Sequence, residues 1–183
     1  MSDSSKEYTI DDVKREANNE IKKKEQSQRI QLIIFRMGSE EFGVSIEQIK
    51  EIVLTPNIAK MPQAPTYIKG VANIRGNIIA ILNLEEKFGI SESATVENKN
   101  SSYTMVLESE TIKAGILVKD VPNTLTISVD DIDNASNFIQ LSGVDENCIM
   151  GVVKSGERLI IMLDIMKLME TININTTVSK AIN

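Results

Sequence analysis

The chain contains two copies of one sequence pattern, and this internal repeat constrains the fold more than any other feature. The segment Gly70–Leu84, GVANIRGNIIAILNL, aligns without gaps on the segment Gly151–Ile165, GVVKSGERLIIMLDI, at an offset of 81. A second pairing, at an offset of 72, aligns residues 33–49 with residues 105–121. Because repeats of this length each form a unit of supersecondary structure, they predict two similar small folds rather than one long sheet.

The two repeat units, about residues 29–89 and 102–168, consist of short apolar runs separated by turn signals. Isoleucine, valine, leucine and methionine must form the core, because the chain has no Trp, three Tyr and four Phe. Several runs are apolar on both faces, as expected where one small barrel packs against its twin. The sequence therefore predicts a mainly β protein of two small barrels. Strands are expected at residues 29–37, 42–46, 71–74, 78–84, 103–107, 114–118, 125–129, 138–141, 149–153 and 159–163.

Helical patterns are confined to the ends of the chain and to its connections. A thin apolar stripe predicts a helix over Thr9–Lys24, which can either dock on the domain or a partner or remain a frayed tail. Short helical turns are expected after Ser45, at Glu85–Phe88 and at Ile165–Met169. The expected boundaries are a polar, partly helical extension (1–28), one two-barrel domain (29–172) and a polar tail (173–183).

A turn signal, Arg75-Gly76-Asn77, interrupts the first copy of the repeat between two apolar runs. Gly76 can adopt the positive φ that a two-residue hairpin turn needs, which places Arg75 at the tip of the hairpin. An arginine on a rigid turn suits recognition of a partner. Spacing alone nevertheless favours an ordinary solvated turn residue, so the role of Arg75 stays open at this point.

Composition and charge disfavour whole classes of function. The net charge is −6 and the pI about 4.9, which disfavours binding to nucleic acid. The chain has no histidine, the commonest general base and metal ligand. The single cysteine, Cys148, is expected to be a small buried apolar group rather than a reactive thiol. No apolar leader and no run of about 18 apolar residues is found, so a soluble, intracellular protein in a reducing compartment is expected.

No arrangement of side chains predicts catalysis. A phosphate-binding glycine loop is absent, and a serine or cysteine nucleophile would have no histidine partner. The adjacent carboxylates Glu40-Glu41, Glu85-Glu86 and Asp130-Asp131 lie in expected turns or loops, where such pairs are usually solvated. Residues 130–134 are similar to a calcium loop but lack its glycine and terminal glutamate, so they are expected to form an acidic surface loop. A binding module, without metal or cofactor, is what remains.

Five motifs, in order and at compatible spacing, resemble the CheW family of chemotaxis coupling proteins over about residues 31–170. The central motif, GVANIRGNIIAILNLEEKFG, is similar to the family signature G-V-x-N-L-R-G followed by an apolar strand and D-L-x-x-x-F. The other four motifs are FGVSIEQIKEI, MPQAPTYIKGV, AGILVKDV and IMGVVKSGERLIIMLDIMKLM. The resemblance implies two five-stranded SH3-like barrels with a core between them.

The resemblance also implies a function and its partners. Such proteins are non-catalytic adaptors that link the cytoplasmic tips of methyl-accepting chemotaxis receptors to the regulatory domain of the histidine kinase CheA. The chain would then be cytoplasmic, recruited to receptor arrays at the membrane without inserting into it. Two alternatives stay open: a module that senses a small molecule in a pocket between the barrels, and a paralogous CheW-like module with another kinase or receptor. An enzyme based on paired carboxylates is the weakest possibility.

The functional positions of the family transfer residue by residue onto the motifs. Arg75 matches the arginine implicated in contacting the receptor tip, and Ile49 and Glu51 match positions on the same partner-facing groove. The residues implied to bind the receptor are Ile49, Glu51, Gly70, Asn73, Arg75, Gly76, Gly115, Val121 and Gly151. Phe138 and Asp133 are implied to bind the kinase. The glycines also have a structural interpretation, in which they permit turns and close approach of strands.

The chain departs from the family pattern at four positions. Ala80 replaces the usual proline of the signature strand, and Asn83 replaces the usual aspartate; both are expected to be tolerated. Lys119 stands where an acidic residue is frequent, and Asp133 where a basic one is frequent. These charge reversals are expected to be exposed and to reflect a co-adapted or paralogous kinase partner.

Overall fold

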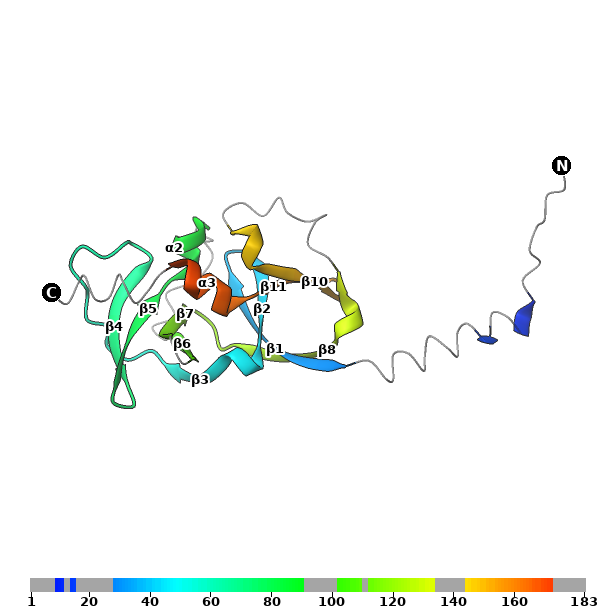
Figure 1. The fold of residues 1–183 in the computed structure, drawn as a ribbon, viewed down its shortest axis with the longest axis horizontal. Coiled ribbons are helices and arrows are strands. Elements are labelled where there is room, and N and C mark those ends of the chain that lie inside the picture. Colours follow the sequence, from blue (N-terminus) through cyan, green and yellow to red (C-terminus); the bar gives the residue numbers. More distant parts are fainter. Residues whose placement is uncertain are drawn as a thin grey trace.

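The computed structural model describes residues 9–11, 14–15, 28–90, 102–109, 112–133 and 144–172, which form two β-sheets and a few short helices (Figure 1). The strands are β1 (Arg29–Met37), β2 (Glu40–Ser45), β3 (Ile49–Leu54), β4 (Ile68–Ile74), β5 (Asn77–Leu82), β6 (Tyr103–Glu108), β7 (Lys113–Val118), β8 (Asn123–Ser128), β9 (Ile132–Asp133), β10 (Ile149–Ser155) and β11 (Arg158–Leu163). The helices are α2 (Leu84–Phe88) and α3 (Ile165–Ile172), with 3₁₀ turns at Ile46–Gln48, Val129–Asp131 and Glu146–Cys148.

Each sheet takes strands from both repeat units. The first sheet has the order β8-β1-β2-β11-β10-β9, and the second has the order β3-β6-β7-β5-β4. The opening hairpin β1–β2 therefore joins the closing hairpin β10–β11, through the parallel pair β2–β11. The hairpin β6–β7 joins β4–β5 in the same way, through the parallel pair β5–β7. The repeat units thus exchange their first hairpins.

Both sheets curl so that their edges meet, and we call them the first and the second barrel. In the first barrel, β8 continues through the turn Val129–Asp131 into β9, which pairs with β10. In the second barrel, the segment after β3 returns to β4 through a bridge between Ala59 and Val71. Val71 and Val152 are equivalent in the offset of 81, and Val152 pairs with Asp133 of β9. Both barrels are therefore closed at the same position of the repeat, which is Val71 in the second barrel and Val152 in the first.

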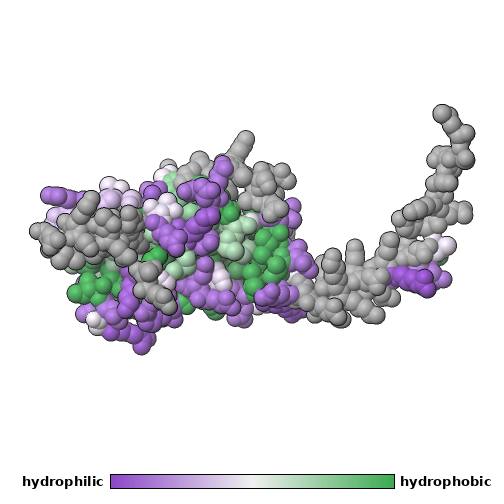
Figure 2. Space-filling model, viewed as in Figure 1, coloured by the Kyte–Doolittle hydropathy of each residue, from purple (hydrophilic) through white to green (hydrophobic). Residues whose placement is uncertain are grey.

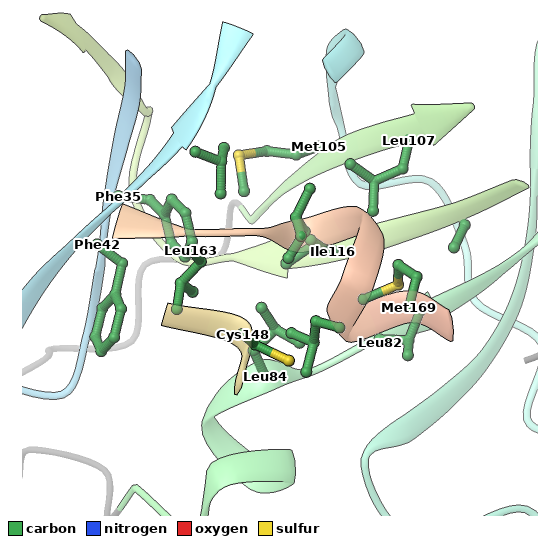
Figure 3. Packing of buried hydrophobic residues seen from close by; sticks show 14 of the residues in the cluster. Phe35, Phe42, Leu82, Leu84, Met105, Leu107, Ile116, Cys148, Leu163 and Met169 are labelled. Carbon is green, nitrogen blue, oxygen red and sulfur yellow. The ribbon is translucent and has the colours of Figure 1, made fainter. Parts of the chain in front are cut away.

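Three apolar clusters explain why the strands are apolar on both faces. On β1, Leu32 and Ile34 point into the first barrel, whereas Ile33 and Phe35 point into a core between the barrels. A third cluster fills the second barrel. Figure 3 shows how the central core gathers residues far apart in sequence, among them Phe35, Leu84, Leu163 and Met169. Helix α3 belongs to this core, because Ile165, Leu168, Met169 and Ile172 are buried.

The sequence prediction of a mainly β protein with two β subdomains is confirmed. One barrel has five strands as expected, while the other gains a sixth, the two-residue β9. The expected acidic surface loop at 130–134 is wrong in part, because Ile132 and Asp133 form β9. The apolar run 78–84 is divided, since β5 ends at Leu82 and Leu84 begins α2. The proposed domain boundaries stay predictions.

Two other expectations can be followed only in part. Of the helix expected at 9–24, Thr9, Ile10, Asp11, Lys14 and Arg15 are described, and all of these except Thr9 are helical. The strand expected at 138–141 lies outside the described residues. The replacement Asn83 is accommodated, because its Oδ1 accepts hydrogen bonds from the backbone N–H groups of Glu85 (2.9 Å) and Glu86 (3.4 Å) and so caps α2 as an aspartate would.

Candidate functional site

The β4–β5 hairpin presents Arg75 at its tip. Both turn residues have positive φ, 49° at Arg75 and 86° at Gly76, which is the backbone of a tight two-residue turn. The backbone N–H of Gly76 donates to Oδ1 of Asn73 at 2.9 Å, which fixes the turn. The Arg75 side chain is 77% exposed. Arg75 and Asn73 therefore lie where the sequence predicts, on an ordered and accessible turn.

Arg75 is held by another predicted site residue, Glu51. The Arg75 Nε donates to Oε2 of Glu51 at 2.7 Å, and the Glu51 side chain is 19% exposed. These residues lie on opposite edges of the second sheet, on β3 and after β4, so barrel closure brings them together. The ion pair spans the seam of the barrel. The arginine side chain nevertheless remains largely exposed and can meet an acidic partner group.

Ile49 lies at the start of β3 and is half-buried against the central core. Beyond it the side chains of β3 alternate, and Lys50, Ile52 and Leu54 point outward. Ile52 is 37% and Leu54 63% exposed, and Ile78 beside the hairpin tip is 72% exposed. The alternation along IKEIVL is the sequence signal for Ile52 and Leu54, and Ile78 has no such signal. None of the three was predicted as a site residue. Figure 2 shows apolar areas that interrupt the hydrophilic surface on the face it draws.

The rim around this surface is charged. Glu108 of β6 forms ion pairs with Lys50 and with Lys113, the latter at 3.3 Å. A hollow of about 20 Å³ lies within this rim, which is far smaller than the site of a drug-sized ligand. We call this area the hairpin surface; it comprises Lys50, Glu51, Ile52, Leu54, Arg75, Ile78, Glu108 and Lys113.

Three predicted receptor-binding glycines are buried, not displayed. A Cβ on Gly70 would lie 2.8 Å from the Ala59 carbonyl carbon, and one on Gly151 would lie 2.8 Å from the Asp133 carbonyl oxygen. Because neither glycine has a Cβ, the segment that closes each barrel can pass close to the backbone of the strand at that position. Gly115 is enclosed by Thr104 and Ile81 side chains. A role of these glycines in binding would have to act through the shape of the barrels.

The remaining predicted residues lie elsewhere. Val121, on the connection between β7 and β8, is 60% exposed. Asp133 is exposed at the end of β9, where its carboxylate lies 3.8 Å from Nζ of Lys154. Phe138 lies outside the described residues. The structure therefore brings Ile49, Glu51, Asn73, Arg75 and Gly76 together and places Val121 and Asp133 on other segments.

Lys119 was expected to be an exposed charge, and this expectation is wrong. Its side chain is 33% exposed and forms an ion pair of 2.7 Å with Glu85, whose side chain is 10% exposed. The Glu85 Oε1 also accepts a hydrogen bond from the backbone N–H of Gly38 at 3.1 Å. The expectation failed because Lys119 and its partner Glu85 are far apart in the sequence. Lys119 follows β7, whereas Glu85 follows β5 of another hairpin, and only the folded structure brings them together.

Two other polar groups have a shifted pKa with a clear physical cause. Burial raises the pKa of the Cys148 thiol, which is fully buried in the central core (Figure 3), as expected for a packing residue. The Arg158 guanidinium donates to Glu41 at 2.7 and 3.0 Å and holds the pKa of that carboxyl below its ordinary value. Among the described residues, no three His, Cys, Asp or Glu side chains converge as metal ligands would. In the same part of the chain, no helix is long and apolar enough to cross a bilayer.

Two larger hollows lie on the first barrel. One of about 370 Å³ is lined by residues of β8 and β10, and one of about 450 Å³ lies beside Glu41 and Arg158. The small-molecule alternative placed its pocket between the barrels. There the structure places a cluster of buried apolar side chains, in which Leu82, Leu107 and Leu163 are among the members with no exposed surface.

Comparison with known proteins decides the family. The model of the CheW-like domain family matches residues 31–173, the region that carries both barrels. The chain belongs to the CheW family. A curated relative from Treponema pallidum, named chemotaxis protein CheW, is 34% identical over 143 residues, 77% of this chain and 82% of that protein. The chemotaxis protein CheW of Helicobacter pylori is 29% identical over 156 residues, 85% of this chain and 91% of that protein.

A solved structure shares the CheW fold found here. The crystal structure of the scaffolding protein TtCheW from Thermoanaerobacter tengcongensis matches with a TM-score of 0.65 and 26% identity. The match covers 75% of this chain and 85% of that one. The resemblance read from the five motifs is thereby confirmed, together with the fold that it implied.

Proposed function

We propose that this chain is a non-catalytic scaffold of chemotaxis signalling, which couples the cytoplasmic tips of methyl-accepting receptors to the regulatory domain of a CheA-type histidine kinase. Membership of the CheW family and the scaffolding description of the solved relative support this proposal. The geometric observation that carries it is Arg75, exposed on a rigid turn and oriented by Glu51 beside the outward side chains of β3. This is a surface for a protein partner rather than a cavity for a substrate.

The hairpin surface has the features that a helical receptor tip needs. Ile52, Leu54 and Ile78 offer exposed apolar area, and Arg75 with the lysines of the rim offers charge-assisted hydrogen bonds to acidic side chains. The apolar side chains would lie against the apolar face of a helix, while the charges set its register. The buried Gly70 and Gly115 would support this surface from within.

Coupling would be positional, not chemical. A scaffold that holds a receptor on one surface and the kinase on another changes the kinase by altering the population of its arrangements. We propose that the kinase contact includes Asp133 of β9, on the first barrel, and that the predicted residue Phe138 contributes to it. The protein would act in the cytoplasm, recruited to the receptor arrays.

The charge reversal Arg75→Glu tests the receptor site. Because Arg75 is a turn residue with an exposed side chain, the variant should keep a native circular dichroism spectrum and lose receptor binding at least about tenfold, a change of about 1.4 kcal/mol. Binding is measured by co-elution and titration with a soluble receptor cytoplasmic fragment. Arg75→Lys, which keeps the charge but loses the planar fork, should fall between the two.

The internal repeat supplies a matched control. Glu157 occupies the turn of the equivalent β10–β11 hairpin and is exposed, so Glu157→Arg is a charge reversal of equal size and opposite sign outside the proposed site. It should leave receptor binding unchanged. Equal binding by the folded Arg75→Glu variant and the native chain would remove Arg75 from the site, and a native chain that co-elutes with neither partner would overturn the coupling function.

A further inference from the structure

One carboxylate connects the two barrels. Glu85 lies in the first turn of α2, directly after the second barrel's strand β5, and only 8% of the residue is exposed. Its Oε1 accepts from the N–H of Gly38, which lies in the β1–β2 turn of the first barrel. Its Oε2 lies 2.7 Å from Nζ of Lys119, directly after β7. Three segments from two barrels therefore meet at one side chain.

This connection is not a product of the repeat. The position equivalent to Glu85 at the offset of 81 is Met166 of α3, and the position equivalent to Lys119 at the offset of 72 is Glu47. The other half of the molecule builds a corresponding barrel and helix without an ion pair between these two positions. The Glu85–Lys119 pair is thus not needed to form a barrel, and its contacts lie where the two barrels are joined.

Lys119 also anchors a crossing segment. The chain leaves the second barrel at Val118, crosses through residues 119–122 and enters the first barrel at Asn123. Val121, two residues beyond Lys119, is 60% exposed and is one of the proposed partner contacts. A lysine held by Glu85 at the start of this crossing fixes where Val121 is presented, and Gly38 ties the same point to the β1–β2 turn.

We propose that Glu85 and Lys119 form a charge-matched clasp that fixes the crossing segment 119–122 against the β1–β2 turn, and that the charge of Lys119 is matched to Glu85 inside the chain rather than to a residue of the kinase. The part that concerns the kinase rests on the proposed function. The clasp itself does not.

An exchange of the two charges tests the clasp. Lys119→Glu faces Glu85 with a like charge, and Glu85→Lys faces Lys119 with one, so each single variant should lower the Tm by about 3 °C or more. The double variant Glu85→Lys/Lys119→Glu restores opposite charges and should recover at least half of that loss. Its recovery is incomplete because a lysine introduced at position 85 could not accept the hydrogen bond of the Gly38 N–H. Hydrogen exchange of the Gly38 amide should accordingly be faster in every variant that lacks Glu85.

A neighbouring ion pair, formed by the next residue of α2 with a lysine of β4, is the control. Glu86 and Lys69 form an ion pair in which the two side chains are 35% and 36% exposed. Glu86→Gln should shift the Tm by no more than about 1 °C, whereas the milder Glu85→Gln should shift it clearly more. If a charge-reversed variant fails to fold, the Tm is measured instead for a second double-mutant cycle, which consists of Glu85→Gln, Lys119→Met and the double variant. Additive losses without coupling, in either cycle, would overturn the clasp.

Binding to the kinase domain shows whether the charge of Lys119 is matched to Glu85 within the chain or to a residue of the kinase. The Tm-restored double variant should co-elute with the kinase regulatory domain as the native chain does. Recovery of the Tm with binding still lost at least tenfold would overturn the internal match and assign Lys119 to the kinase. If the native chain itself binds no kinase domain, the proposed function fails, while the coupled Tm losses still establish the clasp.

Discussion

At the scale of single residues, Gly70 shows how closely the barrels are closed. Its φ is 141°, and its Cβ position is occupied by the backbone of Ala59. Gly70→Ala should therefore lower the free energy of unfolding by about 3 kcal/mol or more, because backbone rather than a flexible side chain must move. Urea unfolding measures this loss.

Gly76 provides the comparison for that substitution. It also has a positive φ, but a Cβ there would meet no atom within 4 Å, so Gly76→Ala carries conformational strain alone, about 1 kcal/mol. If the two variants were equally stable, the crossing at Ala59 would not be the reason for a glycine at position 70. Receptor binding is then measured with whatever Gly70→Ala protein folds. Unchanged binding would show that Gly70 has a structural role alone, and weaker binding would support the proposed binding role.

Single residues also show where sequence reasoning reaches its limit. Arg75 could be placed at a hairpin tip, because a turn is a local structure and Gly76 marks it. Its partner Glu51 could be named only through the family resemblance, since the ion pair forms when the sheet curls. The Lys119–Glu85 pair was missed for the same reason: each residue follows a different strand, and only tertiary structure brings them together.

At the scale of elements, the repeat predicts the register of pairing but not the partners. Ile34 pairs with Asn123, and Val106 pairs with Glu51, so both equivalent pairs keep the offset of 72. The hairpins were predictable from their turns. The exchange of the hairpins β1–β2 and β6–β7 between the barrels could not be predicted. An apolar face shows that a strand is buried, but it does not show which other strand covers it. β9 was missed because two residues in an acidic run carry no periodicity.

The parallel pair β2–β11 carries an ion pair that makes its stability depend on pH. Arg158 lowers the folded-state pKa of Glu41, so the stabilisation is present above the unfolded-state value of 4.5 and is lost as the pH falls through the folded value. Glu41→Gln should therefore lower the Tm by about 2 °C near pH 7, and the difference should shrink towards about pH 3. Thermal unfolding of both proteins across this range measures it, and a difference independent of pH would exclude this origin.

At the scale of the whole molecule, the exchange of hairpins makes the two barrels interdependent. Residues 29–90 contain β1 and β2 of the first barrel with β3, β4 and β5 of the second, so they complete neither. This fragment alone should show no cooperative thermal transition by circular dichroism. Mixing it with residues 102–172 should restore one, because the missing strands are then supplied. A cooperative transition in the first fragment by itself would contradict this interdependence.

The same exchange determines when the strands of the first barrel can pair during synthesis on the ribosome. The hairpin β1–β2 is made early, yet one of its edges awaits β8 and the other awaits β11, which are made near the end. Its apolar side chains, including Leu32 and Ile34, must therefore remain uncovered while about one hundred further residues are added, several seconds at ordinary rates of synthesis. Because uncovered apolar strands are prone to aggregate, we expect the yield of folded protein in a cell to depend on chaperones that protect the nascent chain until its last strand emerges.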